Sequence, residues 1–168
     1  MIDVELTSGT YAAHWGLTDL YPEAEKKLRE AVDSGEEFFV EYGCKKEIRY
    51  AKIVREDDTK VTVFAHMDDL YEDGDLIMDA LWSRCKSEDG FDEDVTDDIC
   101  EEAYEEDIND VACVWSNLPR NASYDEIMTE IGLLENKAER ELEVMFDKLC
   151  DIVERYYNAG RSDSDGKA

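Results

Sequence analysis

The sequence predicts an α+β protein with a small three-stranded antiparallel sheet in the N-terminal half and a helical C-terminal half. Three β-rich runs, EFFVEY (37–42), EIRYAKIVR (47–55) and KVTVFAH (60–66), are separated by connections of only a few residues, which is typical of an antiparallel meander. From residue 69 onward, apolar residues recur instead at helical steps of three and four.

A short strand and a helix are expected before the meander. Ile2, Val4 and Leu6 alternate with polar residues, as in a strand with one buried face. The helix begins near Pro22, a residue favoured at the first helical position, and ends at Gly35, a natural C-terminal cap. Apolar residues fall on both faces of the three β-rich runs, so at least one face of the sheet should pack against helices.

Two helices are expected after the meander. The apolar residues within 76–81 have i, i+4 spacing, with Asp73 or Asp75 as the N-terminal cap. A second helix is predicted over 94–115, with its apolar residues mainly on one stripe. The segment SNLPRNA (116–122) is predicted to be a loop.

The final helix has the clearest sequence signals. Ser123 and Glu126 form a capping box, in which each side chain satisfies a free backbone N–H of the other residue. Apolar residues then recur at steps of three and four from Ile127 to Tyr156, and the helix is expected to end near Gly160. This spacing leaves two alternatives open, a monomer and a homodimer through the C-terminal helix.

The length of 168 residues suits one compact domain. We expect residues 1–160 to form a single α+β domain, with the sheet in 1–67 and the acidic helices in 68–160. The polar segment 161–168 is expected to be a disordered tail.

The charge of the chain is strongly negative and unevenly distributed. There are 45 Asp and Glu residues against 18 Lys and Arg residues, a net charge of −27. Segment 68–110 alone holds 19 acids and only two bases, Arg84 and Lys86, and the next basic residue is Arg120. Because so large a net charge destabilises a compact chain, a basic protein partner is expected, and nucleic acid or an anionic membrane is not.

The remaining composition favours a folded protein of a reducing cytosol. Aromatic residues make up 10% of the chain, whereas acidic disordered chains are poor in them. The five cysteines include no CxxC pair, which indicates a reducing compartment without a disulfide framework. No secretory signal begins the sequence, and no apolar run approaches the ~20 residues that span a bilayer.

The sequence gives no strong sign of catalysis, and no cofactor or metal ligand is predicted. EF-hand loops centred on Gly74 or Gly90 place the wrong residues at ligand positions. Glu101, Glu102 and Glu105 match the EExxE of helical nucleotide pyrophosphatases, but the final helix lacks the ExxD that such enzymes carry. A metal-dependent nucleotide hydrolase is therefore a less favoured alternative, and the chain is expected not to be an enzyme.

The acids of the predicted helix and of the segment before it are the candidate partner-binding residues. Like-charged pairs at i and i+4 cost a few tenths of a kcal/mol each, about 2–3 kcal/mol in all, and no Lys or Arg relieves them. Tyr71, Phe91 and Tyr104 are candidate apolar anchors beside them. The candidate acids are Asp68, Asp69, Glu72, Asp73, Asp75, Asp92, Glu93, Asp94, Asp97, Asp98, Glu101, Glu102, Glu105, Glu106 and Asp107.

In its small size, clustered carboxylates over 68–110 and cytosolic cysteines, the chain resembles phage and mobile-element inhibitors that mimic DNA, such as anti-CRISPR and antirestriction proteins. The resemblance is one of character, without a family motif. It implies a non-catalytic inhibitor that occupies the basic nucleic-acid-binding surface of a bacterial defence complex, most directly a Cas effector. An antirestriction protein, an acidic binder of another basic protein, and a solvated acidic face on a protein of unrelated function are the alternatives.

Overall fold

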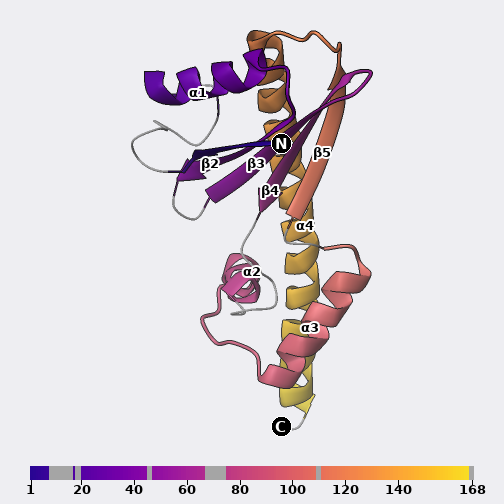
Figure 1. Ribbon diagram of the computed structural model, residues 1–168. Coiled ribbons are helices and arrows are strands. Elements are labelled where there is room, and N and C mark those ends of the chain that lie inside the picture. Colours follow the sequence, from indigo (N-terminus) through magenta and orange to yellow (C-terminus); the bar gives the residue numbers. More distant parts are fainter. Residues whose placement is uncertain (8–16, 18–19, 45–46, 67–74, 109–110, 167–168) are drawn as a thin grey trace. The chain divides into compact units, whose positions relative to one another are not determined.

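The computed structural model describes residues 1–7, 17, 20–44, 47–66, 75–108 and 111–166 (Figure 1). Its elements are β1 (Ile2–Leu6), α1 (Pro22–Asp33), β2 (Phe38–Cys44), β3 (Glu47–Arg55), β4 (Thr59–His66), α2 (Asp75–Cys85), α3 (Glu93–Glu105), β5 (Val111–Leu118) and α4 (Tyr124–Gly166).

The chain forms two compact units. Unit 1 comprises Met1–His66 and Val111–Arg140, and unit 2 comprises Met67–Asp110 and Glu141–Ala168. Helix α4 contributes its first part to unit 1 and the remainder to unit 2. That the whole chain acts as a single domain stays a prediction.

Unit 1 contains a five-stranded mixed sheet in the order β1-β2-β3-β4-β5. The three predicted runs form β2, β3 and β4, which pair antiparallel. The prediction of a three-stranded antiparallel sheet is nevertheless wrong, because β1 pairs with β2 in parallel at one edge and β5 pairs with β4 at the other. A parallel neighbour requires a crossover connection, and α1 lies in the chain between β1 and β2.

Strand β5 replaces the second half of a predicted helix. The prediction of one helix over 94–115 is wrong beyond residue 105, and the prediction of a loop over 116–122 is wrong for 116–118: α3 ends at Glu105 and Val111–Leu118 is a strand. Within β5 the exposure alternates, with Ala112 and Val114 buried and Trp115 exposed. This period of two identifies a half-buried strand at the sheet edge.

The turn after α3 explains where the helix ends. Asp107 has a φ of 60°, in the left-handed region that terminates helices and that Asp adopts more readily than most residues. Its N–H donates to the Tyr104 carbonyl at 3.2 Å, and the Ile108 N–H donates to the Ala103 carbonyl at 2.9 Å. Ile108 and Ala103 are both buried in the same cluster, which is the apolar contact that accompanies this capping motif.

The inner face of the sheet forms the core of unit 1. Figure 1 shows α4 passing behind the sheet. Polar bonds join this face to the helices: Arg55 Nη2 donates to the Val32 carbonyl of α1 at 2.9 Å, and the Ser116 hydroxyl bonds Glu130 of α4 at 2.6 Å. The buried side chains of this face are Val4, Leu6, Phe38, Val40, Tyr42, Ala51, Ile53, Val61, Val63, Ala65, Ala112 and Val114.

The predicted helix boundaries hold for α1 and for the start of α4. Helix α1 begins at Pro22, and Gly35 beyond its end has a positive φ of 73°. The Glu126 N–H donates to the Ser123 hydroxyl at 3.2 Å, which is one of the two bonds of the predicted capping box, and the Ser123 hydroxyl itself donates to Glu126 Oε1 at 3.3 Å. Helix α4 continues to Gly166, past the expected end near Gly160, so the expected tail starts as helix. Among the described residues, no helix combines the length and apolar character needed to cross a membrane.

Candidate functional site on helix α3

Helix α3 begins at an acidic cap. Asp92 precedes the helix in an extended conformation, and its carboxylate accepts a hydrogen bond of 2.9 Å from the Val95 N–H. Glu93 and Asp94 follow in the first turn, where the positive end of the helix dipole stabilises negative charge. The stability of the helix itself therefore accounts for these three acids.

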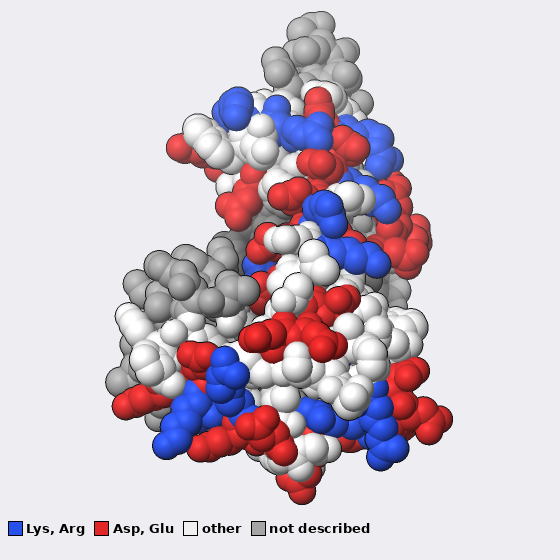
Figure 2. All heavy atoms as spheres, turned by 90° about the horizontal axis from the view of Figure 1, so that it is seen from above, with Lys and Arg blue, Asp and Glu red and all other residues white. Residues whose placement is uncertain are grey.

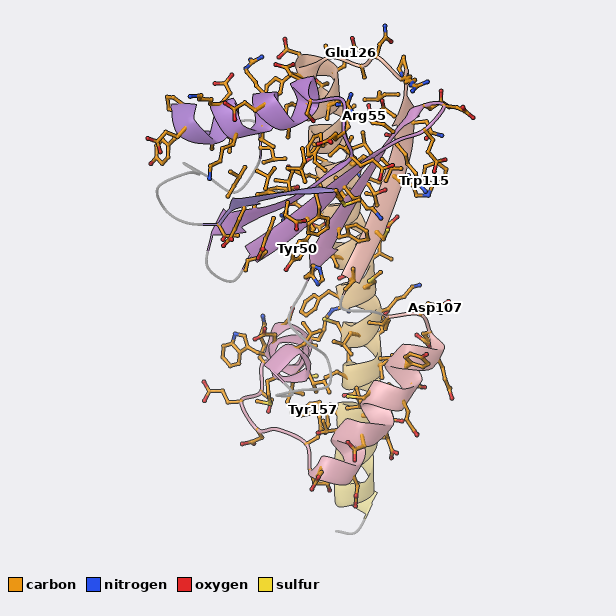
Figure 3. All side chains as sticks on the ribbon, viewed as in Figure 1. Tyr50, Arg55, Asp107, Trp115, Glu126 and Tyr157 are labelled. Atoms are coloured by element: carbon orange, nitrogen blue, oxygen red, sulfur yellow. The ribbon has the colours of Figure 1, made fainter. Side chains whose placement is uncertain are left out.

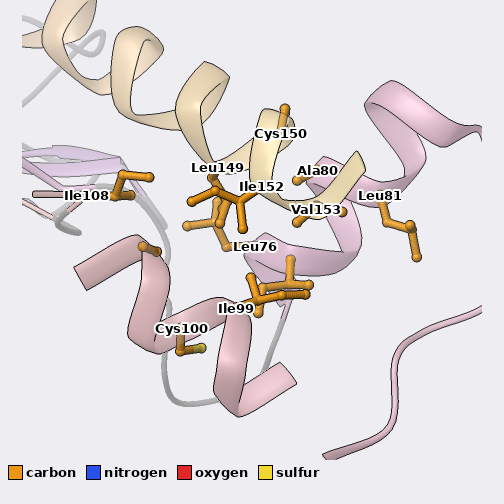
Figure 4. Close-up of a cluster of buried hydrophobic side chains, with 12 residues drawn as sticks. Leu76, Ala80, Leu81, Ile99, Cys100, Ile108, Leu149, Cys150, Ile152 and Val153 are labelled. Carbon is orange, nitrogen blue, oxygen red and sulfur yellow. The ribbon is translucent and has the colours of Figure 1, made fainter. Parts of the chain in front are cut away.

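One side of α3 is buried in the core of unit 2 (Figure 4). Ile99 and Ala103 are fully buried, and Cys100 nearly so. Because this side is fixed by packing, the acids of the remaining turns must face α4 or solvent. The partners of this side in the cluster include Leu76, Ile77, Ala80 and Leu81 of α2 and Leu149, Cys150, Ile152 and Val153 of α4.

One row of acids along α3 consists of Asp98, Glu102 and Glu106. It is here called the paired row, because Arg155 of α4 compensates part of its charge. Arg155 Nη1 donates to Glu102 Oε1 at 2.8 Å. This bond and the charge of Glu102 raise the pKa of Arg155, with a smaller contribution from Glu106. Burial first, and then the charges of Glu102 and Asp98, raises the pKa of the Tyr156 hydroxyl. The paired row therefore borders α4.

Asp97, Glu101 and Glu105 form a second row, here called the outer row. All three are exposed, and among the described residues their carboxylates have no ion pair or hydrogen bond. Together with Cys100 and Tyr104 they line a shallow open groove. The outer row is thus a line of carboxylates one helical turn apart, about 5.4 Å, with an accessible hollow beside it.

Tyr104 is the exposed aromatic residue of this surface. It is 67% exposed, which is unusual for a ring that could pack against the core. Of the other two predicted anchors, Phe91 is half-buried and packs against the unit 2 cluster, and Tyr71 lies outside the described residues. Tyr104 is therefore the predicted anchor that the structure leaves available to a partner.

The acids predicted before α3 are mostly outside the described residues. Asp68, Asp69, Glu72 and Asp73 belong to this group, and Asp75 is the first residue of α2. At the other end of the predicted set, Asp107 lies beyond the C-terminal cap of α3 and is exposed (Figure 3).

The charge of the molecule is concentrated in unit 2. By sequence, unit 2 holds 26 acids and 6 bases, a net of −20, and unit 1 holds 19 acids and 12 bases, a net of −7. Figure 2, which views the molecule from above, shows Lys and Arg side chains among Asp and Glu on that face. Both units thus have an excess of acids, and the excess is much larger in unit 2.

The basic residue of α2 does not compensate α3. Arg84 contacts three acids of α4: its guanidinium lies 3.7 Å from Asp147, 3.2 Å from Asp151 and 3.7 Å from Glu154. The other relevant base, Arg155, could not be found from the sequence, because it is distant in the chain from Glu102 and no local signal links the two residues.

The EExxE acids do not converge in this structure. Glu102 belongs to the paired row and bonds Arg155, whereas Glu101 and Glu105 belong to the outer row. In the described part of the chain, no group of three or more His, Cys, Asp or Glu side chains is arranged to hold a metal ion.

Comparison of the chain with protein-family models, with curated proteins and with solved structures finds no match.

Proposed function

We propose that this protein is a non-catalytic acidic inhibitor that binds the basic nucleic-acid-binding surface of another protein in place of DNA. The specific form we favour is an anti-CRISPR protein that acts on a Cas effector. The observation that carries the proposal is the outer row, Asp97, Glu101 and Glu105, which is exposed and uncompensated among the described residues and which flanks the exposed ring of Tyr104.

The spacing of the outer row suits a partner that binds a phosphate backbone. Its carboxylates recur about every 5.4 Å along the helix axis, whereas duplex DNA carries one charge per about 1.7 Å. The row is sparser than DNA, but each carboxylate can accept two parallel hydrogen bonds from one arginine. Arginines that read a PAM or clamp a DNA backbone are therefore suitable partners.

Tyr104 adds the apolar contact that charge alone does not provide. Exposed ion pairs contribute little free energy, because both charges are well solvated before they meet. A tyrosine ring beside the outer row buries apolar area on binding and loses few rotamers. Specificity for one target then depends on this ring as well as on the carboxylates.

The internal bond between Glu102 and Arg155 distinguishes the two rows. The paired row is partly compensated within unit 2, so it has less unbalanced charge to offer than the outer row. We therefore assign the contact with the partner to the outer row, supported by Asp94 and Asp107.

The proposal is tested by competition for DNA. A fluorescent target duplex is bound to a purified Cas effector and guide, and the protein is titrated in while anisotropy is followed; a restriction enzyme with its own duplex is tested in parallel. We expect displacement of DNA from at least one of them, weakening as salt rises. A triple variant, Asp97→Asn, Glu101→Gln and Glu105→Gln, should lose most of the displacement.

The matched control removes charge from the paired row instead. Asp98→Asn with Glu106→Gln changes two carboxylates of the same helix and leaves the Glu102–Arg155 bond in place. This double variant should retain most of the displacement. Equal loss in both variants contradicts the assignment to the outer row, and failure to displace DNA from effectors and restriction enzymes of every class tested contradicts the function.

A further inference from the structure

Strand β5 lies at one edge of the sheet in unit 1, as Figure 1 shows, and one side of its backbone is unpaired. On the other side it pairs with β4 along its whole length, from Val111 opposite His66 to Leu118 opposite Thr59. In an antiparallel pair, every second residue bonds the neighbouring strand, and the residues between direct their N–H and C=O groups away from it. Among the described residues, no backbone group of β5 bonds a segment other than β4.

The two edges of this sheet differ in their protection against further strands. Natural edge strands are commonly short, or they carry charged residues or proline, which prevents another strand from pairing with them. Strand β1, at the opposite edge, has five residues and carries the exposed acids Asp3 and Glu5. Strand β5 has eight residues, VACVWSNL, with no charged residue and no proline. In a chain with 38% charged residues, such an edge suits the addition of a strand.

The acids of the chain are also absent from the two strands at this edge. Strands β4 and β5 contain none of the 45 Asp and Glu residues, and they contain one lysine, Lys60. The Lys60 ammonium lies 4.6 Å from the centre of the Trp115 ring. Two copies of a chain with a net charge of −27 repel each other wherever acids face acids. At the β5 edge, two copies meet without this repulsion.

We propose that a second copy of this chain pairs its β5 antiparallel with this β5 and forms a symmetric dimer with one continuous sheet. The twofold axis is perpendicular to the sheet and passes beside Val114, which lies opposite Val114 of the second copy. Trp115 then lies opposite Cys113 of the second copy, and Asn117 lies opposite its Val111. Each contact away from the axis is made twice, as a twofold interface requires.

The sequence of β5 selects this alignment. Directly opposed residues of antiparallel strands have side chains on the same face, so shifts by one residue are excluded. A shift by two residues in one direction places Pro119 opposite Val111, and proline has no N–H to donate. A shift in the other direction shortens the paired run. In the alignment chosen, the small residues Ala112 and Ser116 oppose each other on the inner face.

The acids closest in sequence to the edge strands do not oppose this dimer. Glu56, Asp57 and Asp58 of the β3–β4 turn line an open hollow together with Asn117, near one end of β5. Because the two β5 strands run antiparallel, the turns of the two copies lie at opposite ends of the paired run. A run along 111–117 at about 3.4 Å per residue is roughly 24 Å long, so the two turns are well separated.

The dimer is expected to be weak. The contact is one strand wide, so it lies at the small end of specific interfaces. Its backbone hydrogen bonds replace bonds to water, and each therefore contributes only about 0.5–1.5 kcal/mol. We expect a dimer that dissociates on dilution, with a dissociation constant of about 10–100 μM.

A strand of another protein and single-stranded nucleic acid are the competing occupants. Bases stack on exposed rings such as Trp115, which is 54% exposed and is labelled in Figure 3. A phosphate backbone, however, needs several bases, and the two edge strands supply Lys60 alone in a chain with a net charge of −27. The second copy is favoured because it brings a strand of equal length that is itself free of charge.

The dimer is tested by sedimentation velocity of the full chain over about 1–500 μM at about 0.15 M salt. A reductant is included, because Cys113 is an exposed free cysteine. The wild-type protein should shift from monomer to dimer across this range. One double variant, Val111→Glu with Asn117→Glu, places glutamates opposite each other at both ends of the run. A second, Val111→Lys with Asn117→Lys, does the same with lysines. Each should raise the dissociation constant about tenfold or more.

Mixing the two double variants is the decisive measurement. In a mixed dimer, both glutamates of one chain lie opposite lysines of the other. The mixture should therefore regain a dissociation constant within about threefold of the wild type. A variant that had simply lost its fold cannot be rescued in this way. The control is Lys52→Glu, on the neighbouring strand β3 and away from the edge, which should leave the dissociation constant within about threefold of the wild type.

Three results overturn the proposal. The first is a wild-type protein that stays monomeric at every concentration; a single-stranded oligonucleotide that binds this monomer then assigns the edge to nucleic acid. The second is a mixture of the two double variants that stays monomeric although circular dichroism shows both to be folded. The third is a dimer that ignores both double variants but is lost when Leu133 and Val144, exposed apolar residues of α4, are changed to Ser, which indicates association through that helix.

Discussion

The Tyr42 hydroxyl donates a hydrogen bond of 2.7 Å to Glu135 Oε1, which joins β2 to α4 inside unit 1. Tyr42 is only 1% exposed, and burial, followed by the charge of Glu135, raises its pKa far above the ordinary range. Burial also raises the pKa of Glu135, while the bond from Tyr42 and the charge of Arg49 lower it. The partly buried carboxylate of Glu135 is thus held by the buried hydroxyl of Tyr42 and by the backbone N–H of Leu17.

Tyr42→Phe should therefore destabilise unit 1. The variant keeps the ring in the core but removes the hydroxyl that donates to Glu135 Oε1, so that this carboxylate keeps the backbone N–H of Leu17 and loses its bond to β2. Losing a buried hydrogen bond of this kind costs about 1–3 kcal/mol. Urea unfolding followed by circular dichroism measures the change. Tyr104→Phe removes the same hydroxyl from a residue that is 67% exposed and should change the stability by less than about 0.5 kcal/mol.

Glu135→Gln should change how stability depends on pH. Because the pKa of Glu135 is raised in the folded protein, the native state holds its proton to higher pH than the unfolded chain, whose glutamate pKa is about 4.3. The free energy of unfolding that this proton contributes is fully present below the pKa of Glu135 in the unfolded chain. It is lost as the pH rises through the pKa of Glu135 in the folded protein. The variant, which has no such group, should gain stability relative to wild type as the pH rises above about 4. A pH-independent difference in unfolding free energy contradicts the prediction.

Asp107 should tolerate only residues that accept a left-handed backbone. At a φ of 60°, Asp107→Asn should be nearly neutral, whereas Asp107→Val should destabilise unit 2 by about 1–2 kcal/mol, since a β-branched side chain clashes in this region. Thermal unfolding of the two variants side by side separates the backbone effect from the loss of the charge. Equal melting temperatures for both contradict the assigned turn.

Arg155→Gln should strengthen binding to the basic target identified by DNA competition. The substitution frees the Glu102 carboxylate from its bond to Arg155, so that the negative charge of the paired row adds to that of the outer row. Lys148→Gln is the matched control, because Lys148 is an exposed base of the same helix. This substitution removes the same charge but leaves the bond between Arg155 and Glu102 in place. We expect the affinity to rise severalfold, by about 3–10 times, for Arg155→Gln and to change less for Lys148→Gln, measured at fixed salt.

The parts of the fold with local signals could be predicted from sequence. Pro22 and Gly35 mark the ends of α1, and the capping box at Ser123 marks the start of α4, because each residue type has a specific backbone role there. The three central strands follow from their composition and short connections. Each of these strands pairs with the strand that is next to it in the chain, so a single sequence is sufficient to predict their pairing.

The edges of the sheet depend on contacts that are distant in sequence. Nothing within Ile2–Leu6 reveals that β1 pairs in parallel with β2, since a strand does not encode its neighbour. In Val111–Leu118, apolar residues continued the helical spacing of α3 by coincidence, and the left-handed turn at Asp107, made without a glycine, was not recognised. The wrong period was therefore assigned to β5.

The candidate site shows the same division. The sequence revealed that 68–110 lacks basic residues, which is a local property. It could not reveal that Arg155 bonds Glu102, because that pairing depends on how α4 packs against α3. The separation of the acids into an outer row and a paired row is therefore a structural result.

The place of β5 in the chain has a consequence for synthesis. Its partner in the sheet, β4, ends at His66, and His66 pairs with Val111 across the whole of segment 67–110. At translation rates of about 5–20 residues per second, β4 leaves the ribosome several seconds before β5. During that interval the nascent sheet ends at an unpaired strand, which is a template for other chains. To avoid aggregation, the nascent chain needs either a chaperone that shields exposed strand edges or the early folding of that intervening acidic segment.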